Sequence, residues 1–327
     1  MNSFGRIFRV SIFGESHGCC AGVCIDGCPP GIPMSESDFE YDMSRRRSGA
    51  CGTTPRKEAD MTRIMSGVFN GFTTGSPVLL MVENTNTRSQ DYSLFCNVPR
   101  PGHADFVAGK KYKGFADYRG GGHFSGRLTA GIVMAGVVAK KIIAPAVIGS
   151  RILEIGGKAD WQDVIEQCVA THDSAGGIVE CMVNELPVGW GEPFFDSVES
   201  VISHAVFSVP AVKGIEFGAG FAAARMRGSE HNDIFTGKDG ATATNHAGGI
   251  NGGITNGNPI VFRVAIKPTS SIARLQQTTN ISTGEMVCLE TPGRHDACIT
   301  LRVPAVLEAV TAISLADLKM ISETITN

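Results

Sequence analysis

The chain has 327 residues, 43 % hydrophobic and 19 % charged, and its 29 Lys and Arg against 32 Asp and Glu give a net charge of −3. This balance argues against a protein that binds nucleic acid or a membrane through a basic surface, and the apolar content excludes a disordered chain. Glycine, at 40 residues, exceeds the usual level of about 7 %, which indicates many turns and close backbone approaches.

Hydrophobic periodicity predicts short strands and a few helices without a regular β-α-β order. In chain order we expect strands at 6–13, 78–82, 178–183, 215–218, 260–266 and 298–303, and helices at 35–46, 127–143, 161–171, 196–207 and 304–321. This order is typical of an α+β fold in which helices pack on antiparallel sheets. We expect one domain over residues 1–327, or two halves that share one core.

No targeting or membrane segment is evident in the sequence. The first residues lack the charged and apolar regions of a signal peptide. The most hydrophobic segment, 128–149, is interrupted by Lys140, Lys141 and Pro145, and this predicts a buried helix and not a membrane span. Ten cysteines without a CxxC pair predict free thiols in a cytoplasmic protein.

The net charge conceals two different regions. Between Arg45 and Arg127 there are 13 basic and 6 acidic residues, a local charge of +7, whereas the rest of the chain carries −10. Nine of the basic residues are arginines that lie among Gly, Ser, Thr and His. Because the guanidinium group matches phosphate and carboxylate geometry, this region predicts a site for an anionic small molecule. A solvated charged surface is the alternative interpretation.

Several familiar motifs are absent or lack their structural context. The sequence contains neither GxxxxGK[ST] nor HExxH. Residues 14–18 match GxSxG, but the glycines and prolines that follow do not predict the helix that a nucleophilic serine requires. Residues 218–223 match GxGxxA without a surrounding β-α-β unit. His295 and Cys298 are too few for a metal site.

Polar residues and glycines instead gather in a few other segments. His17 follows a predicted strand, and Arg100 and His103 lie three residues apart around a Pro-Gly bend. A triple glycine stands between Arg119 and Arg127, directly before a predicted helix, and such a loop presents backbone N–H groups to an anion. Segments 245–257 and 267–271 add a glycine surface and a hydroxyl-rich turn. An ordinary turn is the alternative interpretation of each segment alone. Together they suit a polyanionic ligand with a flat cofactor, and proton transfer.

Eight motifs in one order resemble the chorismate synthase family: FGESHG at 13–18, SRRRSG at 44–49, NTRSQDY at 86–92, RPGHAD at 100–105, DYRGGG at 117–122, NHAGGINGG at 245–253, KPTSSI at 267–272 and GRHD at 293–296. The resemblance implies a lyase that converts 5-enolpyruvylshikimate 3-phosphate to chorismate by 1,4-anti elimination of phosphate. This is the last shared step of aromatic amino-acid biosynthesis by the shikimate pathway, and it needs reduced FMN without net redox change. The resemblance also implies helices sandwiched between antiparallel β-sheets, and a cytoplasmic homotetramer.

The resemblance further assigns roles to individual residues. It implies that His17 protonates the leaving phosphate, that His103 stabilises the anionic flavin, and that Asp296 works with flavin N5 as a proton relay. Substrate contacts are expected at Ser16, Arg46, Arg100 and Arg127. FMN contacts are expected at His123, Phe124, Ser125, Pro210, Ala211, Gly252, Lys267, Pro268, Thr269, Ser270, Ser271 and Arg294. No metal is expected. NADPH is a candidate reductant that would bind at Arg46, and a separate flavin reductase is the alternative source of reduced flavin.

Two departures from the family pattern concern the segment after the triple glycine. His123 replaces an arginine and Leu128 replaces a glutamate that many relatives carry, and both changes remove charge near the expected flavin. Two other functions are compatible with the same residues. One is a flavin oxidoreductase that consumes NADPH, and the other is an anion-binding protein without catalytic activity.

Overall fold

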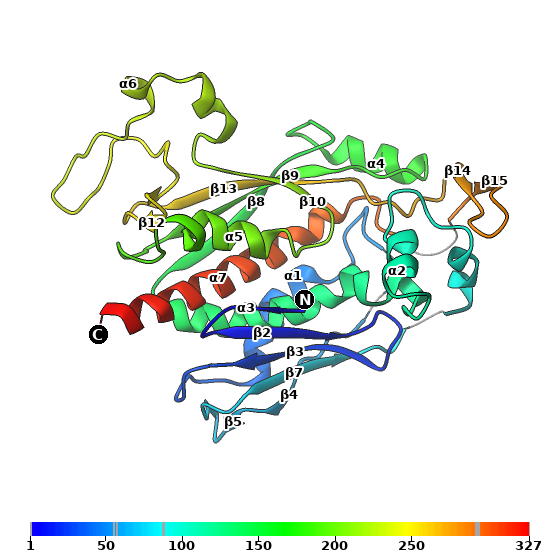
Figure 1. Ribbon diagram of the computed structural model, residues 1–327, viewed down its shortest axis with the longest axis horizontal. Coiled ribbons are helices and arrows are strands. Elements are labelled where there is room, and N and C mark those ends of the chain that lie inside the picture. The colour runs from blue at the N-terminus through cyan, green and yellow to red at the C-terminus, as the bar shows by residue number, and fades with distance from the viewer. Residues whose placement is uncertain (1, 55, 57, 87–88, 292–294, 327) are drawn as a thin grey trace.

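Two antiparallel sheets form the outer layers of the fold and enclose its main helices (Figure 1). The computed structural model describes residues 2–54, 56, 58–86, 89–291 and 295–326. The first sheet has the order β1 (Ser3–Phe4), β2 (Arg9–Gly14), β3 (Cys20–Asp26), β7 (Val78–Glu83), β4 (Arg63–Ser66). The second has the order β10 (Val212–Phe217), β13 (Ile260–Ile266), β9 (Gly177–Asn184), β8 (Val147–Ile155). This arrangement confirms the predicted α+β sandwich.

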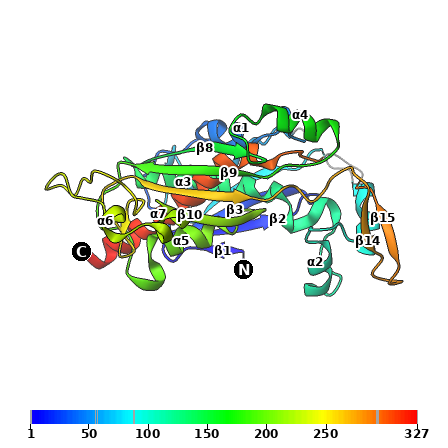
Figure 2. The same ribbon diagram turned by 90° about the horizontal axis from the view of Figure 1, so that it is seen from above.

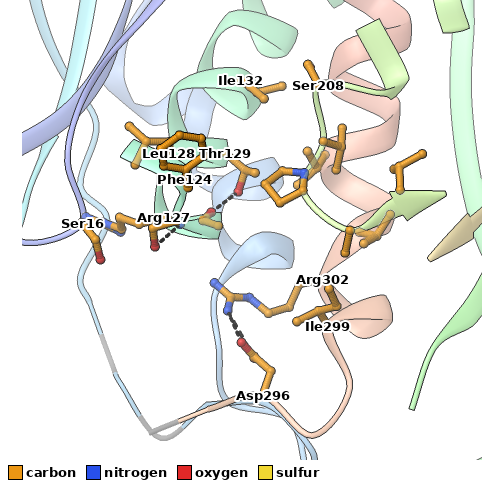
Figure 3. A pocket seen from close by; sticks show the side chains of 18 of the residues that line it. Ser16, Phe124, Arg127, Leu128, Thr129, Ile132, Ser208, Asp296, Ile299 and Arg302 are labelled. Carbon is orange, nitrogen blue, oxygen red and sulfur yellow. Dashed lines mark hydrogen bonds and ion pairs between the residues drawn. The ribbon is translucent and has the colours of Figure 1, made fainter. Parts of the chain in front are cut away.

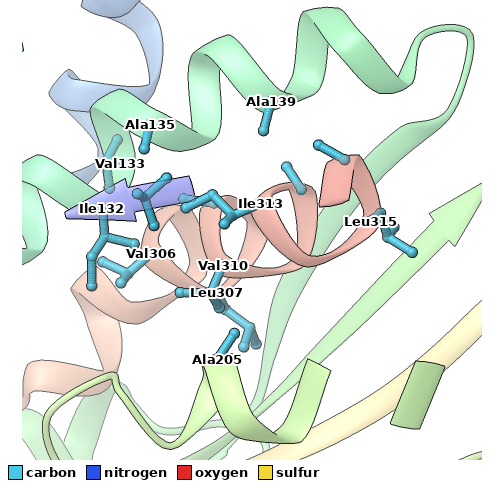
Figure 4. Close-up of a cluster of buried hydrophobic side chains, with 14 of the residues drawn as sticks. Ile132, Val133, Ala135, Ala139, Ala205, Val306, Leu307, Val310, Ile313 and Leu315 are labelled. Atoms are coloured by element: carbon cyan, nitrogen blue, oxygen red, sulfur yellow. The ribbon is translucent and has the colours of Figure 1, made fainter. Parts of the chain in front are cut away.

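Helices α3 (Thr129–Ile143) and α7 (Val303–Thr326) lie between the two sheets and pack against each other (Figures 1 and 4). Helix α3 covers β3 of the first sheet, whereas α7 covers β8 of the second. Their contact is filled by apolar side chains such as Val133, Ala135, Val310 and Ile313 (Figure 4). The remaining helices are α1 (Glu40–Arg46), α2 (Asp105–Lys111), α4 (Gln162–Ala170), α5 (Val198–Val206) and α6 (Gly228–His231).

Two glycines of α3 allow the layers to approach closely. A Cβ atom at Gly131 would lie 2.6 Å from the carbonyl oxygen of Gly22 on β3. A Cβ atom at Gly136 would lie 2.4 Å from the Cβ atom of Ala309 on α7. Neither position has room for a side chain, so glycine sets the spacing between α3 and its neighbours on both faces.

Two buried acidic residues of α7 anchor other segments to the core. Glu308, 2 % exposed, binds both terminal nitrogens of Arg45 at 2.6 Å and the Lys140 ammonium at 3.1 Å. Burial alone would raise the pKa of Glu308, but hydrogen bonds from Arg45 and Ser150 outweigh it and lower the pKa. Asp317 accepts hydrogen bonds from the backbone N–H groups of residues 6–8. Helix α1 and the N-terminal segment are thereby held against α7.

The smaller elements project from the two ends of the sandwich (Figures 1 and 2). Helix α2 and the hairpin β14 (Gln276–Thr279) and β15 (Met286–Leu289) lie at one end. The excursion that carries α6, with the nearby hairpin β11 (Ile250–Asn251) and β12 (Ile254–Thr255), lies at the other. Strands β5 (Val68–Phe69) and β6 (Phe72–Thr73) form a separate two-stranded sheet.

Most predicted elements are confirmed, and the exceptions have identifiable causes. The alternation of Ile260, Phe262, Val264 and Ile266, all buried, gives β13 the predicted bounds. The strand predicted at 298–303 is wrong: these residues form a 3-10 helix, η7 (Ile299–Arg302), that leads directly into α7. Strand β3 was not predicted, because it contains Gly22 at a packing contact and both of its faces contribute to the core. Strand β8 was not predicted either, because its sequence, VIGSRILEI, has no regular alternation of apolar and polar residues.

One helical stretch of the described chain, Ile299–Ile325, is long and apolar enough to cross a membrane. However, 78 % of its apolar window is buried inside the fold, which is typical of a central core helix. All ten cysteines are free thiols, as predicted.

We expect Gly136→Ala to lower the free energy of unfolding by about 1–3 kcal/mol, because the added methyl group overpacks the contact with Ala309. Gly109→Ala in α2 is the matched control, since a Cβ atom there meets nothing within 4 Å and should stabilise the helix by about 0.5–1 kcal/mol. Chemical denaturation of both variants measures the two effects. Equal stability of the two variants would contradict the proposed role of Gly136.

Candidate functional site

A cleft of about 850 Å³ opens between the beginnings of α3 and α7 and the end of α5 (Figure 3). Ser16, Phe124 and Arg127 lie on one side of it, and Asp296 and Arg302 lie on another (Figure 3). The cleft brings together most residues predicted for the site: Ser16, His17, Arg46, Arg100, His103, His123, Phe124, Ser125, Arg127, Pro210, Ala211, Lys267, Pro268, Thr269, Ser270, Ser271 and Asp296.

Two predicted residues are left out of this set for different reasons. Arg294 lies outside the described residues. Gly252 occupies the turn between β11 and β12 and is not among the residues that line the cleft. Its neighbour Gly253 contacts Ser197, which caps the start of α5, whereas the cleft touches the end of that helix. Gly252 therefore lies near the start of α5, a helix roughly 13 Å long, and the cleft lies at its end.

The triple glycine forms the surface against which both site histidines lie. Gly120, Gly121 and Gly122 have φ angles of 62°, 82° and 54°, a region that L-residues with side chains rarely adopt. A Cβ atom at Gly120 would lie 2.7 Å from Nε2 of His17, and one at Gly121 would lie 3.5 Å from Nε2 of His103. Glycine is therefore required at all three positions for the backbone conformation, and at Gly120 also for the close approach of the His17 ring.

His103 is held by a buried ion pair. Its Nδ1 atom lies 2.6 Å from Oδ1 of Asp105, and Arg100 binds the same carboxylate through Nε and a terminal nitrogen, both at 2.8 Å. Burial would raise the pKa of Asp105, but the hydrogen bonds from Arg100 and His103 outweigh it and hold the pKa well below its usual range. The carboxylate favours a proton on Nδ1 of His103, which leaves Nε2 for a ligand.

Arg100 also donates a hydrogen bond to the Ser271 hydroxyl at 2.9 Å. It thus connects the turn of Pro101 and Gly102 to the hydroxyl-rich segment 267–271. The motif RPGHAD contains Asp105, but the sequence alone does not show that this aspartate orients His103.

A buried aspartate joins the two arginines at the floor of the cleft. Asp60 accepts a hydrogen bond from Arg46 at 2.9 Å and another from Arg127 through its second oxygen. Arg46 is 1 % exposed, and burial together with the nearby charges of Arg302 and Arg127 lowers its pKa to about 9. Nε of Arg46 donates to the Thr129 hydroxyl. Its other terminal nitrogen donates to the carbonyl oxygens of Gly126 and Arg127.

The cleft as a whole carries an excess of positive charge. Among the described lining residues, seven are basic (Arg46, Arg47, Arg56, Arg100, Arg127, Lys267 and Arg302) and three are acidic (Glu58, Asp60 and Asp296), an excess of four positive charges. Nε of Arg47 is buried without a hydrogen-bond partner in the structure. This excess and the unused donor indicate an anionic ligand.

Asp296 is fixed by a residue that sequence analysis missed. Its carboxylate oxygens both lie 3.2 Å from a terminal nitrogen of Arg302, and one accepts a hydrogen bond from the backbone N–H of Thr54 at 2.9 Å (Figure 3). Nε of Arg302 also donates to the carbonyl oxygen of Arg46 at 2.9 Å. The sequence analysis predicted a strand for the segment that contains Arg302. A strand does not indicate that Arg302 turns back to contact Asp296, so the residue was not identified.

Segment 267–271 and the facing helices form walls suited to a flat cofactor with an anionic tail. Lys267 donates to the Ser270 hydroxyl at 2.7 Å, and burial and the charge of Lys213 lower the pKa of the Lys267 ammonium group. The Thr269 hydroxyl is buried without a hydrogen-bond partner in the structure. An apolar wall faces these groups and consists of Leu128, Ile132, Val209, Pro210, Ile299, Val303 and Val306. The apolar wall and the unpaired hydroxyl fit a flavin mononucleotide.

Two residues of the predicted flavin segment are already engaged by the protein. His123 lies with Nδ1 2.8 Å from the carbonyl oxygen of Gly14, so the ring is directed to the end of β2. The Ser125 hydroxyl accepts a hydrogen bond from the N–H of Arg127 and caps the turn before α3. Both residues also line the cleft.

The structure excludes two alternative motif interpretations. Residues 14–18 connect β2 and β3 in a hairpin, and a nucleophilic serine of the GxSxG type requires a helix after the turn. The 218–223 motif follows a strand of an antiparallel sheet, which is incompatible with a dinucleotide-binding β-α-β unit. Among the described residues, no group of three or more His, Cys, Asp or Glu could hold a metal ion.

Comparisons with known proteins find one family along nearly the whole chain. The sequence model of the family described as "Chorismate synthase" matches residues 8–320. The chain is 61 % identical to the chorismate synthase of Chitinophaga pinensis over 99 % of this chain and 98 % of that protein. It is 46 % identical to the chorismate synthase of Dehalococcoides mccartyi over 98 % and 96 % of the two chains. A crystal structure of chorismate synthase superposes with a TM-score of 0.72 at 26 % identity, covering 97 % of this chain and 93 % of that chain.

We expect Asp105→Asn to lower the free energy of unfolding at pH 7 by about 3 kcal/mol, because it leaves Arg100 without its buried partner. The pKa of Asp105 is depressed in the folded state, so its contribution is complete above the unfolded pKa of about 3.9. The contribution is lost as the pH falls through the lower folded value. The difference in Tm between wild type and variant should therefore be largest near pH 7 and shrink below about pH 4.

Asp26→Asn is the control for this measurement, because Asp26 pairs with Arg9 at the surface and exposed pairs contribute little. A Tm difference for Asp105→Asn that stayed constant from neutral to acid pH would contradict the ion-pair assignment.

Proposed function

The chain belongs to the chorismate synthase family, and we propose that its cleft eliminates phosphate from 5-enolpyruvylshikimate 3-phosphate with the help of reduced FMN. The enzyme is a lyase of aromatic biosynthesis that carries out the chorismate-forming step on a small-molecule substrate.

The observation that carries the proposal is the placement of His17 and His103 on the triple glycine, inside a cleft with an excess of four positive charges. The proposed substrate carries one phosphate and two carboxylates, so its charge complements this excess. Arg127 and Arg47 are placed to meet these anions, and the unpartnered Nε of Arg47 has a donor to offer. Arg46 is buried and binds the protein through all three of its nitrogens, so it would support the site by orienting Asp60 and the turn before α3.

His17 is the proposed proton donor to the leaving phosphate. Its ring stands edge-on to Tyr92, at 5.2 Å between ring centres, and against Gly120. These contacts restrict the ring to one orientation, which suits a general acid that must meet one oxygen of the leaving group.

His103 and Asp296 are proposed to serve the cofactor side of the cleft. With Nδ1 bound to Asp105, His103 presents Nε2 to the cleft as a donor when protonated. We propose that the apolar wall holds the ring system of FMN and that Lys267, Thr269 and Ser270 hold its polar groups. Reduced FMN held there would supply a transient electron and an acceptor for the ring hydrogen, which is not acidic enough for a side-chain base alone to remove.

We also propose a cytoplasmic homotetramer, as the family resemblance implies. The source of reduced flavin has two candidates, NADPH acting at this same protein or a separate flavin reductase. The burial of Arg46 and the engagement of all three of its nitrogens by the protein favour a reductant that does not depend on that residue.

We expect the purified protein with reduced FMN and 5-enolpyruvylshikimate 3-phosphate to release phosphate under anaerobic conditions, and to release none with oxidised FMN. Phosphate release and chorismate absorbance measure the reaction. Consumption of NADPH in step with product would instead favour a flavin oxidoreductase, and binding of both ligands without turnover would favour an anion-binding protein.

We expect His17→Ala and Asp296→Ala to lower kcat by about 10²-fold or more, the usual contribution of a proton-transfer group, while FMN affinity changes much less. His172→Ala is the control, because His172 lies exposed in the turn after α4. Near-normal turnover in both site variants would show that the assigned roles are wrong.

A further inference from the structure

The side chain of Asn84, outside the cleft, connects the turn that carries His17 with Arg127 at the floor of the cleft. Asn84 follows β7 directly and is not among the residues that line the cleft. Its Nδ2 group donates to the carbonyl oxygens of Glu15 and Gly18, each at 2.9 Å. The backbone N–H of Asn84 donates to the carbonyl oxygen of Cys19 at 3.1 Å. The amide thus closes the turn at both of its ends.

The other end of the same amide binds Arg127. Oδ1 of Asn84 accepts a hydrogen bond from Nε of Arg127 at 2.8 Å, and the carbonyl oxygen of Glu83 accepts another from a terminal nitrogen at 3.0 Å. A carboxamide has two N–H donors and one carbonyl acceptor. Asn84 uses both donors on the turn and its acceptor on the arginine, so its side chain is fully engaged by these two groups.

Strand register explains why Asn84 can reach both partners. Cys20 pairs with Glu83 across β3 and β7, and Gly14 pairs with Ala21 across β2 and β3. The residue that follows β7 therefore lies beside the hairpin turn at the edge of the cleft. Arg127 reaches the same point from the turn before α3.

A second connection holds the turn from its other side. Arg56 donates to the hydroxyl and carbonyl oxygens of Ser16, each at 3.3 Å, and pairs with Glu58 at 2.7 Å. Glu58 accepts hydrogen bonds from the backbone N–H groups of Thr85 and Asn86, at 3.1 and 3.2 Å. Burial would raise the pKa of Glu58, but the bonds from Arg56 and Thr85 outweigh it and lower the pKa, so the carboxylate stays charged at neutral pH.

We propose that Asn84 is a positioning residue of the reaction, which sets the proton-donating His17 at a fixed place relative to the anion-binding Arg127. The proposal rests on the roles proposed above for His17 and Arg127. Asn84 needs no contact with the substrate for this role. It acts because a displacement of about 1 Å between a catalytic group and its target lowers the rate strongly.

Two substitutions separate the contacts of Asn84. Asn84→Leu removes all three side-chain hydrogen bonds at similar volume. Asn84→Asp keeps an oxygen for Arg127 but replaces both donors with an oxygen that repels the carbonyl groups of Glu15 and Gly18. We expect both variants to lower kcat by about 10²-fold with FMN affinity unchanged. Asn70→Asp, in the exposed turn between β5 and β6, is the control and should keep the wild-type kcat.

A double-mutant cycle tests whether Asn84 acts through His17. If it does, Asn84→Leu combined with His17→Ala should be about as slow as His17→Ala alone, since the displaced group is already absent. Losses in kcat that multiply in the double variant would overturn the proposal. So would wild-type kcat in either single variant, or a kcat loss in Asn84→Leu that Asn84→Asp does not share.

A readout independent of turnover distinguishes this proposal from the proposed function. We expect the imidazole resonances of His17 in the NMR spectrum of the unliganded protein to move in both Asn84 variants, while those of His172 stay in place. Absence of phosphate release by the wild type would overturn the proposed function alone. Unchanged His17 resonances in both variants would overturn the role of Asn84, whatever the wild type does.

Discussion

The close contact between α3 and α7 is the constraint on which the rest of the structure depends. Gly136 meets Ala309 across this contact, and Gly131 meets β3 on the other side of α3. With these spacings set, the segments that precede the two helices must face each other at one end of the sandwich. One segment carries the triple glycine and Arg127, and the other carries Asp296 and Arg302. The cleft is the space that this convergence leaves open.

Charge balance determines how the arginines of this cleft are used. A buried guanidinium needs a partner, because the cost of removing it from water is several kcal/mol. Three carboxylates supply part of the compensating charge and also orient the arginines. They are Asp60, which pairs with Arg46 and Arg127, Glu58, which pairs with Arg56, and Asp296, which pairs with Arg302. The compensation is incomplete, so a ligand with several negative charges would complete it. Within the +7 segment of the sequence, Arg46, Arg47, Arg56, Arg100 and Arg127 line the cleft, so this part of its charge belongs to a local site.

Sequence analysis, together with the family resemblance, predicted site residues that stand in tight turns. His17, His103 and Asp296 stand in segments whose glycines or prolines require tight turns, and the structure places all three in the cleft. It failed for the residues that orient them. Asn84 and Arg302 are single polar residues without a periodic pattern, and their partners lie far away in the sequence. Gly252 belongs to a motif that precedes the start of β13, whereas the residues that line the cleft follow the end of that strand.

The sequence by itself determined the alternating pattern of β13 and the apolar surfaces of α3 and α7. It also determined which positions carry glycines that can adopt positive φ, and it supplied the arginines and histidines for a polyanion site. These follow from local periodicity, side-chain volume and charge, which each segment carries alone. Only the tertiary structure decided that Asp60 lies between Arg46 and Arg127, that Asp105 orients His103, and that Asn84 joins the His17 turn to Arg127. These contacts depend on strand register and helix packing, which bring together groups whose local sequences contain no information about each other.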